Sequence, residues 1–189
     1  MSLSREEANE LHTRYYKDYG LAIEGLVRHH KVDPLEYNKQ VDDALPLEDI
    51  LGPDAELRRF LETLDTTKVK PWLLTNAYIT HGKRVVRLLG VDDLFEGITF
   101  CDYGAHPFLC KPAPDMFAKA MREAGIKAVK DCYFVDDSAI NATGAEKFGW
   151  SSVHLVEPND KPPAKSASRH QIRHLEELRG LFPQFFKQA

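Results

Sequence analysis

Apolar and polar positions along the first fifty residues recur at helical spacing. Ser4 followed three residues later by Glu7 is a capping-box signature, and Gly20 marks a helix end. The pattern continues through residues 21–30, and Asp33 followed by Pro34 indicates the start of a third helix. Residues 1–50 are therefore predicted to form a helical unit without a strand.

Beyond residue 51 the pattern changes to strand-like runs that alternate with helical ones. We predict strands at 71–75, 98–101, 132–135 and 152–156, and helices at 54–64, 80–89, 115–124 and 138–148. A polar, proline-rich loop at 157–168 precedes a last predicted helix at 171–181. The alternation is typical of an α/β fold, a Rossmann-like parallel sheet covered on both faces. The predicted division is a helical cap at 1–50 and a core at 51–189.

Composition and charge exclude several classes of function. The 189 residues are 43% hydrophobic and carry a net charge of −4, without a basic cluster for nucleic acid. No apolar run approaches the roughly 20 residues of a membrane helix, and the polar N-terminus is unlike a signal peptide. The three cysteines match no zinc spacing and are expected to be buried thiols. We therefore expect a cytoplasmic protein, with the nucleus as a second compartment.

Candidate chemistry lies where the predicted strands end. Thr75 and Asn76 follow one strand, Lys111 stands just before Pro112 after the next, and Asp136 and Asp137 close a third. Ligands of parallel α/β sheets bind at the carboxyl ends of strands. A hydroxyl, an amide, an ammonium and paired carboxylates suit a phosphate ester with Mg²⁺. Each element also has a plain structural interpretation as a turn, a surface lysine or a helix cap.

Three segments then resemble one known family. LLTNA (73–77), KPAPDMF (111–117) and FVDDSAIN (134–141) look like the second, third and fourth motifs of the haloacid dehalogenase-like hydrolases. Residues 15–33 are similar to the helical cap of the pyrimidine 5′-nucleotidase branch of that family. The resemblance implies a Mg²⁺-dependent phosphatase that acts through an aspartyl-phosphate. Its substrate would be a nucleoside 5′-monophosphate or another small phosphorylated metabolite.

The resemblance also implies roles for individual residues. Thr75 and Asn76 would hold the phosphate, and Lys111 would neutralise the phosphate and the nucleophile. Asp137, assisted by Asp136, would hold Mg²⁺.

One expected motif is not found. The family's nucleophile and general acid are two aspartates in a DxDxT motif after a first strand, and no segment of the chain supplies it. Asp65 is followed by two threonines but lacks the second carboxylate. We therefore expect a shortened family member that is catalytically impaired. The alternative is a non-catalytic protein that only binds phosphate ligands or partners; a dehalogenase, which needs the same aspartate, ranks third.

In this fold the strand that carries DxDxT would lie between the strands that end at Thr75 and Val135. Without it, two strand edges would be left unpaired, which is costly. We expect either closure, with Leu73 or Leu74 bonded to Phe134 or Val135, or filling by another chain. The second outcome predicts a homo-oligomer formed through the exposed sheet edge.

Overall fold

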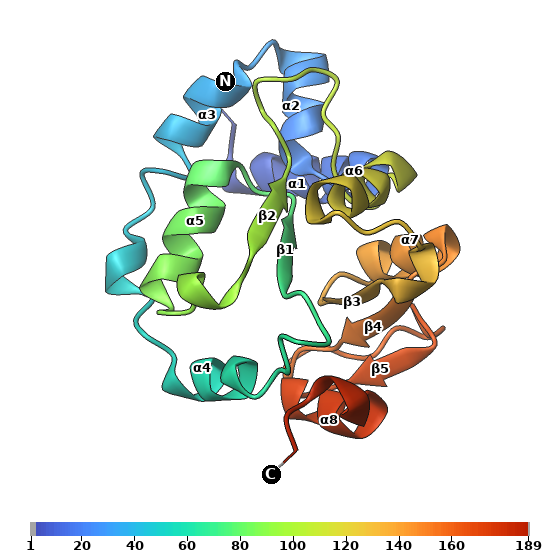
Figure 1. The fold of residues 1–189 in the computed structure, drawn as a ribbon. Helices are drawn as coiled ribbons and strands as arrows, with labels where there is room; N and C mark the ends of the chain where they lie inside the picture. Colours follow the sequence, from blue (N-terminus) through green and yellow to red (C-terminus); the bar gives the residue numbers. More distant parts are fainter. Residues whose placement is uncertain (1–2, 189) are drawn as a thin grey trace.

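The computed structural model describes residues 3–188, so Met1 and Ser2 of the predicted cap and Ala189 of the predicted core lie outside the described residues (Figure 1). Strands and helices alternate after residue 71, which confirms the predicted α/β class. In chain order the helices and strands are α1 (Arg5–Tyr19), α2 (Ala22–His30), α3 (Pro34–Gln40), α4 (Ala55–Glu62), β1 (Trp72–Thr75), α5 (Ile79–Leu88), β2 (Gly97–Phe100), α6 (Pro114–Ala124), β3 (Tyr133–Asp136), α7 (Ala139–Phe148), β4 (Ser151–Leu155), β5 (His170–Ile172) and α8 (Leu178–Leu181).

The N-terminal segment is helical, and its local signals form as the sequence predicts. Glu7 N donates to Ser4 Oγ at 3.2 Å, and Ser4 N donates to Glu7 Oε2 at 2.8 Å, which closes the capping box of α1. α2 packs against α1 at Gly25, where an added Cβ would stand 2.1 Å from the Tyr15 ring. This close approach requires glycine. A domain boundary at residue 50 stays a prediction.

The strands form two separate parallel sheets. β1 pairs with β2, and β3, β4 and β5 pair in that order. The predicted closure is therefore wrong: among residues 3–188, neither Leu73 nor Leu74 pairs with β3. The filling of this position by another chain, and the oligomer that it implies, stay predictions.

One hydrophobic cluster fixes helices α6 and α7 against β3. The Phe117 ring of α6 meets Phe134 of β3 edge-on, with ring centroids 5.9 Å apart, and meets Trp150 at 5.0 Å. Ala145 of α7 completes the cluster and is fully buried. Because these helices are held firmly on the strand, the loops at the carboxyl ends of the strands take defined positions.

The C-terminal segment corrects a prediction. Instead of one helix over 171–181, the strand β5 occupies its beginning, with Ile172 opposite Leu155 of β4. A 3₁₀ turn, Leu175–Glu177, then leads into α8. Ile172, Leu175 and Leu178 are spaced like one helical face, but Ile172 is buried by its place in the sheet. The tertiary contact overrode the local periodicity.

Two further sequence-based expectations concern the whole chain. None of the helices between residues 3 and 188 is both long enough and apolar enough to cross a membrane. All three cysteines are free; Cys101 and Cys110 are buried, as expected, and Cys132 is half-buried. The cellular compartment stays a prediction.

Candidate functional site

Lys111 stands where the two sheets meet. Its side chain is almost fully buried, and its ammonium donates to the backbone carbonyl of Leu74 in β1 at 2.8 Å. The same ammonium donates to Asp136 Oδ2, at the end of β3, at 2.7 Å and lies 5.5 Å from the centre of the Phe134 ring. The lysine thus takes up a β1 carbonyl that closure would have offered to β3. The Lys111 side chain thus bridges two strands that share no backbone ladder.

Asn76 holds the backbone of Lys111 in place. Its Oδ1 accepts from Lys111 N at 2.7 Å, and its Nδ2 donates to Lys111 O at 2.9 Å and to Gly20 O at 3.4 Å. Gly20, in the left-handed conformation at the end of α1, approaches so closely that an added Cβ would stand 2.7 Å from Lys111 O. The Asn76 amide is therefore engaged within the protein, and its predicted contact with phosphate stays a prediction.

Thr75 is the last residue of β1, and its hydroxyl accepts a hydrogen bond but donates none within the described part of the chain. Its Oγ1 accepts from Ala77 N at 3.0 Å, which supports the turn after the strand. Its hydroxyl hydrogen meets no acceptor among residues 3–188. Thr75 directly follows Leu74, whose carbonyl binds the Lys111 ammonium. The hydroxyl is therefore free to donate to a ligand at this edge of the sheet.

Asp136 is a buried carboxylate with both oxygens occupied. Its Oδ1 accepts from Ser138 N at 2.9 Å and from Asn141 Nδ2 at 3.0 Å, and its Oδ2 accepts from Lys111. It thereby satisfies a backbone N–H at the start of α7. The sequence analysis gave Asn141 no role, although its position one turn into that helix is the signal that could have found it.

The Asp137 side chain makes no hydrogen bond with this network. Its side chain is exposed, and its backbone carbonyl lies 3.0 Å from Nε2 of the buried His154. His154, which the sequence analysis also missed, therefore fixes the backbone at the end of β3. The structure thus brings Lys111 into direct contact with both Asn76 and Asp136, and it leaves Asp137 at the surface. Thr75 lies next to Leu74 at the end of β1.

The carboxylates of Asp136 and Asp137 do not by themselves form a Mg²⁺ site. Mg²⁺ requires close to six oxygen ligands in octahedral geometry. Asp136 is already bound to Lys111, and no group of three or more His, Cys, Asp or Glu side chains suited to a metal occurs among the described residues. The predicted pair supplies a single exposed carboxylate beside an occupied one.

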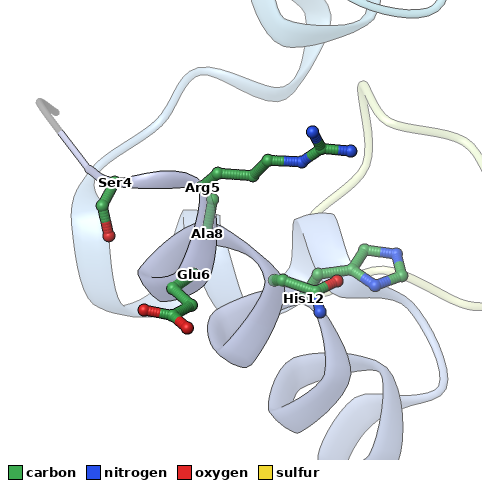
Figure 2. Close-up of a pocket in the computed structure, with 6 residues that line it drawn as sticks. Ser4, Arg5, Glu6, Ala8 and His12 are labelled. Carbon is green, nitrogen blue, oxygen red and sulfur yellow. The ribbon is translucent and has the colours of Figure 1, made fainter.

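A broad hollow of about 800 Å³ runs along the first turns of α1, away from these residues (Figure 2). Figure 2 shows Arg5 and His12 extending to the same side, whereas Glu6 extends elsewhere. All of its lining residues belong to one helix start and its cap: Ser4, Arg5, Glu6, Ala8, Asn9 and His12. None of the predicted site residues reaches it.

Comparison with known proteins identifies the family. A family profile described as haloacid dehalogenase-like hydrolase matches residues 3–149. The chain belongs to this family. It is 40% identical over 161 residues to phosphate metabolism protein 8 of Saccharomyces cerevisiae, a match that covers 80% of this chain and 50% of that protein. The chain thus spans about half the length of this curated relative.

Solved structures of haloacid dehalogenase-like proteins share the fold. A phosphatase from Thermococcus onnurineus aligns with a TM-score of 0.60 at 20% identity over 92% of this chain and 86% of its own. The L-2-haloacid dehalogenase from Xanthobacter autotrophicus gives 0.62 at 16%, over 93% and 82%. The magnesium-bound hydrolase YfnB from Bacillus subtilis gives 0.63 at 15%, over 97% and 85%. These similarities confirm the fold. The reaction has to be inferred from the residues of the site.

Proposed function

We propose that the chain carries the phosphate-binding site of a haloacid dehalogenase-like phosphatase for small phosphate monoesters, with nucleoside 5′-monophosphates as the substrate class. One observation supports the proposal: the buried Lys111 ammonium bridges the carboxyl ends of two strands, and Thr75 directly follows Leu74, whose carbonyl the ammonium binds. An ammonium has three N–H donors, and two are engaged. The third, with the Thr75 hydroxyl, suits a phosphate oxygen. The yeast relative's name, which refers to phosphate metabolism, agrees with this class.

Hydrolysis by this chain is proposed to be slow. The carboxylate that contacts Lys111 among residues 3–188 is Asp136, and it is held by Lys111, Ser138 and Asn141. A carboxylate engaged in this way is a poor nucleophile. Binding without turnover is therefore the second candidate function, and the same engaged carboxylate favours it. A dehalogenase reaction needs a free carboxylate too and makes no use of a phosphate-binding lysine.

Phosphate binding tests the proposal directly. We expect inorganic phosphate to shift the amide NMR signals of Thr75 and Lys111, and Thr75→Val to weaken phosphate binding by about tenfold, since a hydrogen bond to a charged group contributes about 1.5 kcal/mol. Thr66→Val, which removes an exposed hydroxyl elsewhere, is the matched control. Equal phosphate affinity in the two variants would sink the assignment of Thr75.

Magnesium is expected to bind weakly. Mg²⁺ could use Asp137 and, once Lys111 is displaced, Asp136, but the remaining ligands would be water. Calorimetric titration should give a Kd above about 1 mM, and Asp137→Ala should remove the residual binding heat. Sub-millimolar binding that persists in Asp137→Ala would place the metal elsewhere.

A further inference from the structure

Two cysteines meet in the hydrophobic interior next to Lys111. Cys101 directly follows β2, and Cys110 directly precedes Lys111, so both belong to the loop between β2 and α6 (Figure 1). Cys101 is 0% exposed and Cys110 is 6% exposed. Both pack in one cluster of buried residues with Ile23 of α2 and Tyr103. The fold therefore brings two free thiols of the same loop into one buried cluster.

The two thiols are in contact, and the contact makes them unequal. The Cys101 thiol donates a hydrogen bond to the Cys110 sulfur, and Cys110 Sγ itself donates to the carbonyl of Tyr19 at 3.7 Å. The hydrogen bond from Cys101 lowers the pKa of Cys110, and the positive charge of Lys111 acts in the same direction, whereas burial opposes both. Because the thiolate is the reactive form of cysteine, Cys110 is the more nucleophilic member of the pair.

Cys110 is also the member of the pair that a small reagent can approach. It belongs to the lining of a cavity of about 300 Å³, whereas Cys101 has no exposed surface. Hydrogen peroxide has only two heavy atoms and is small enough for such a cavity. Cys101 needs no access of its own, because its partner in the reaction is Cys110. A reachable thiol of lowered pKa beside a second thiol is the arrangement of a peroxide-sensitive cysteine with a resolving partner.

We propose that Cys110 and Cys101 form a peroxide-sensitive site that closes a disulfide within the chain. The Cys110 thiolate attacks one oxygen of hydrogen peroxide, the O–O bond breaks, and the sulfur becomes a sulfenic acid, while the second oxygen leaves as hydroxide and takes up the proton that Cys110 had released. The Cys101 sulfur then attacks the Cys110 sulfur, and the sulfenic hydroxyl leaves with the Cys101 proton as water. Two thiols are oxidised and one peroxide is reduced to two waters. The disulfide would tie the segment that carries Lys111 to the end of β2, whether or not the proposed phosphate site exists.

The test is peroxide treatment of the folded whole chain, followed by thiol counting and peptide mapping. Free thiols should fall from three to one, with the loss of two hydrogen atoms from the monomer mass, and a dithiol reductant should restore all three. Chymotrypsin cleaves after Tyr103 and Phe108, so the disulfide should join two peptides that separate on reduction. The remaining thiol should be Cys132, because it lies in a different part of the core and burial raises its pKa.

Single variants test the order of the two steps. In Cys101→Ala the Cys110 sulfenic acid should persist and react with dimedone, whereas in Cys110→Ala the Cys101 thiol should stay reduced. Cys132→Ala is the matched control and should still lose two thiols together. Oxidation of Cys132 before the pair, a disulfide between two chains, or peroxide treatment that leaves Cys101 and Cys110 unlinked would overturn the inference. The peptide map of the parent chain decides this even if an alanine variant does not fold.

Discussion

The purified chain is expected to hydrolyse p-nitrophenyl phosphate and nucleoside monophosphates at less than about 10⁻³ s⁻¹. Enzymes typically turn over at about 1–10³ s⁻¹, and loss of a covalent nucleophile costs on the order of 10⁴–10⁶ in kcat. The reason lies in the contacts of Asp136, whose two oxygens are held by three donors. The Thr75 hydroxyl is no substitute, because no base among residues 3–188 accepts its proton.

The measurement is a steady-state assay with and without Mg²⁺. Asp136→Asn and Asp137→Asn provide the comparison, and both should leave the low rate essentially unchanged. Turnover within the usual range that Asp136→Asn abolishes would show that Asp136 leaves the lysine and acts as the nucleophile. Turnover that only Asp137→Asn abolishes would assign the chemistry to the exposed carboxylate, and either result would contradict the proposed impairment.

The meeting of Lys111 with Asp136 could be predicted from the sequence. Both follow strand-like runs, and the carboxyl ends of parallel strands share one edge of a sheet. The structure places their charged atoms 2.7 Å apart, although 25 positions separate them in the chain. The fold class could also be predicted, because the alternation of strands and helices strongly constrains the topology.

The role of Asn76 could not be predicted in this way. A side-chain amide at the end of a strand can hydrogen-bond equally well to a ligand or to the backbone. The backbone partner of Asn76 is Lys111, which lies 35 positions further along the chain. The absence of strand closure was equally beyond the sequence pattern, because the contact of the Lys111 side chain with the Leu74 carbonyl is visible only in the packed structure.

Lys111→Met is expected to lower the free energy of unfolding by about 3 kcal/mol, because removing one partner of a buried ion pair costs about 3–5 kcal/mol. The lower end applies because Asp136 keeps its contacts with Ser138 and Asn141. For a chain of this length the loss corresponds to a fall in Tm of about 6–12 °C. Urea denaturation and calorimetry measure both quantities. Lys70→Met is the matched control: Lys70 also donates to a backbone carbonyl, but it is exposed, so its cost should stay below about 1 kcal/mol.

A second substitution separates the charge from the shape of the lysine. In Lys111→Met with Asp136→Asn the uncompensated buried charge is gone, so the double variant should be more stable than Lys111→Met alone. The introduced amide could still accept from Ser138 N through its side-chain oxygen, so the start of α7 would remain capped. If the single variant does not fold, a cooperative unfolding transition in the double variant would still show that the uncompensated charge of Asp136 destabilises Lys111→Met. A Lys111→Met protein as stable as the parent would mean that the ammonium does not join the two sheets, and the phosphate site proposed around it would lose its basis.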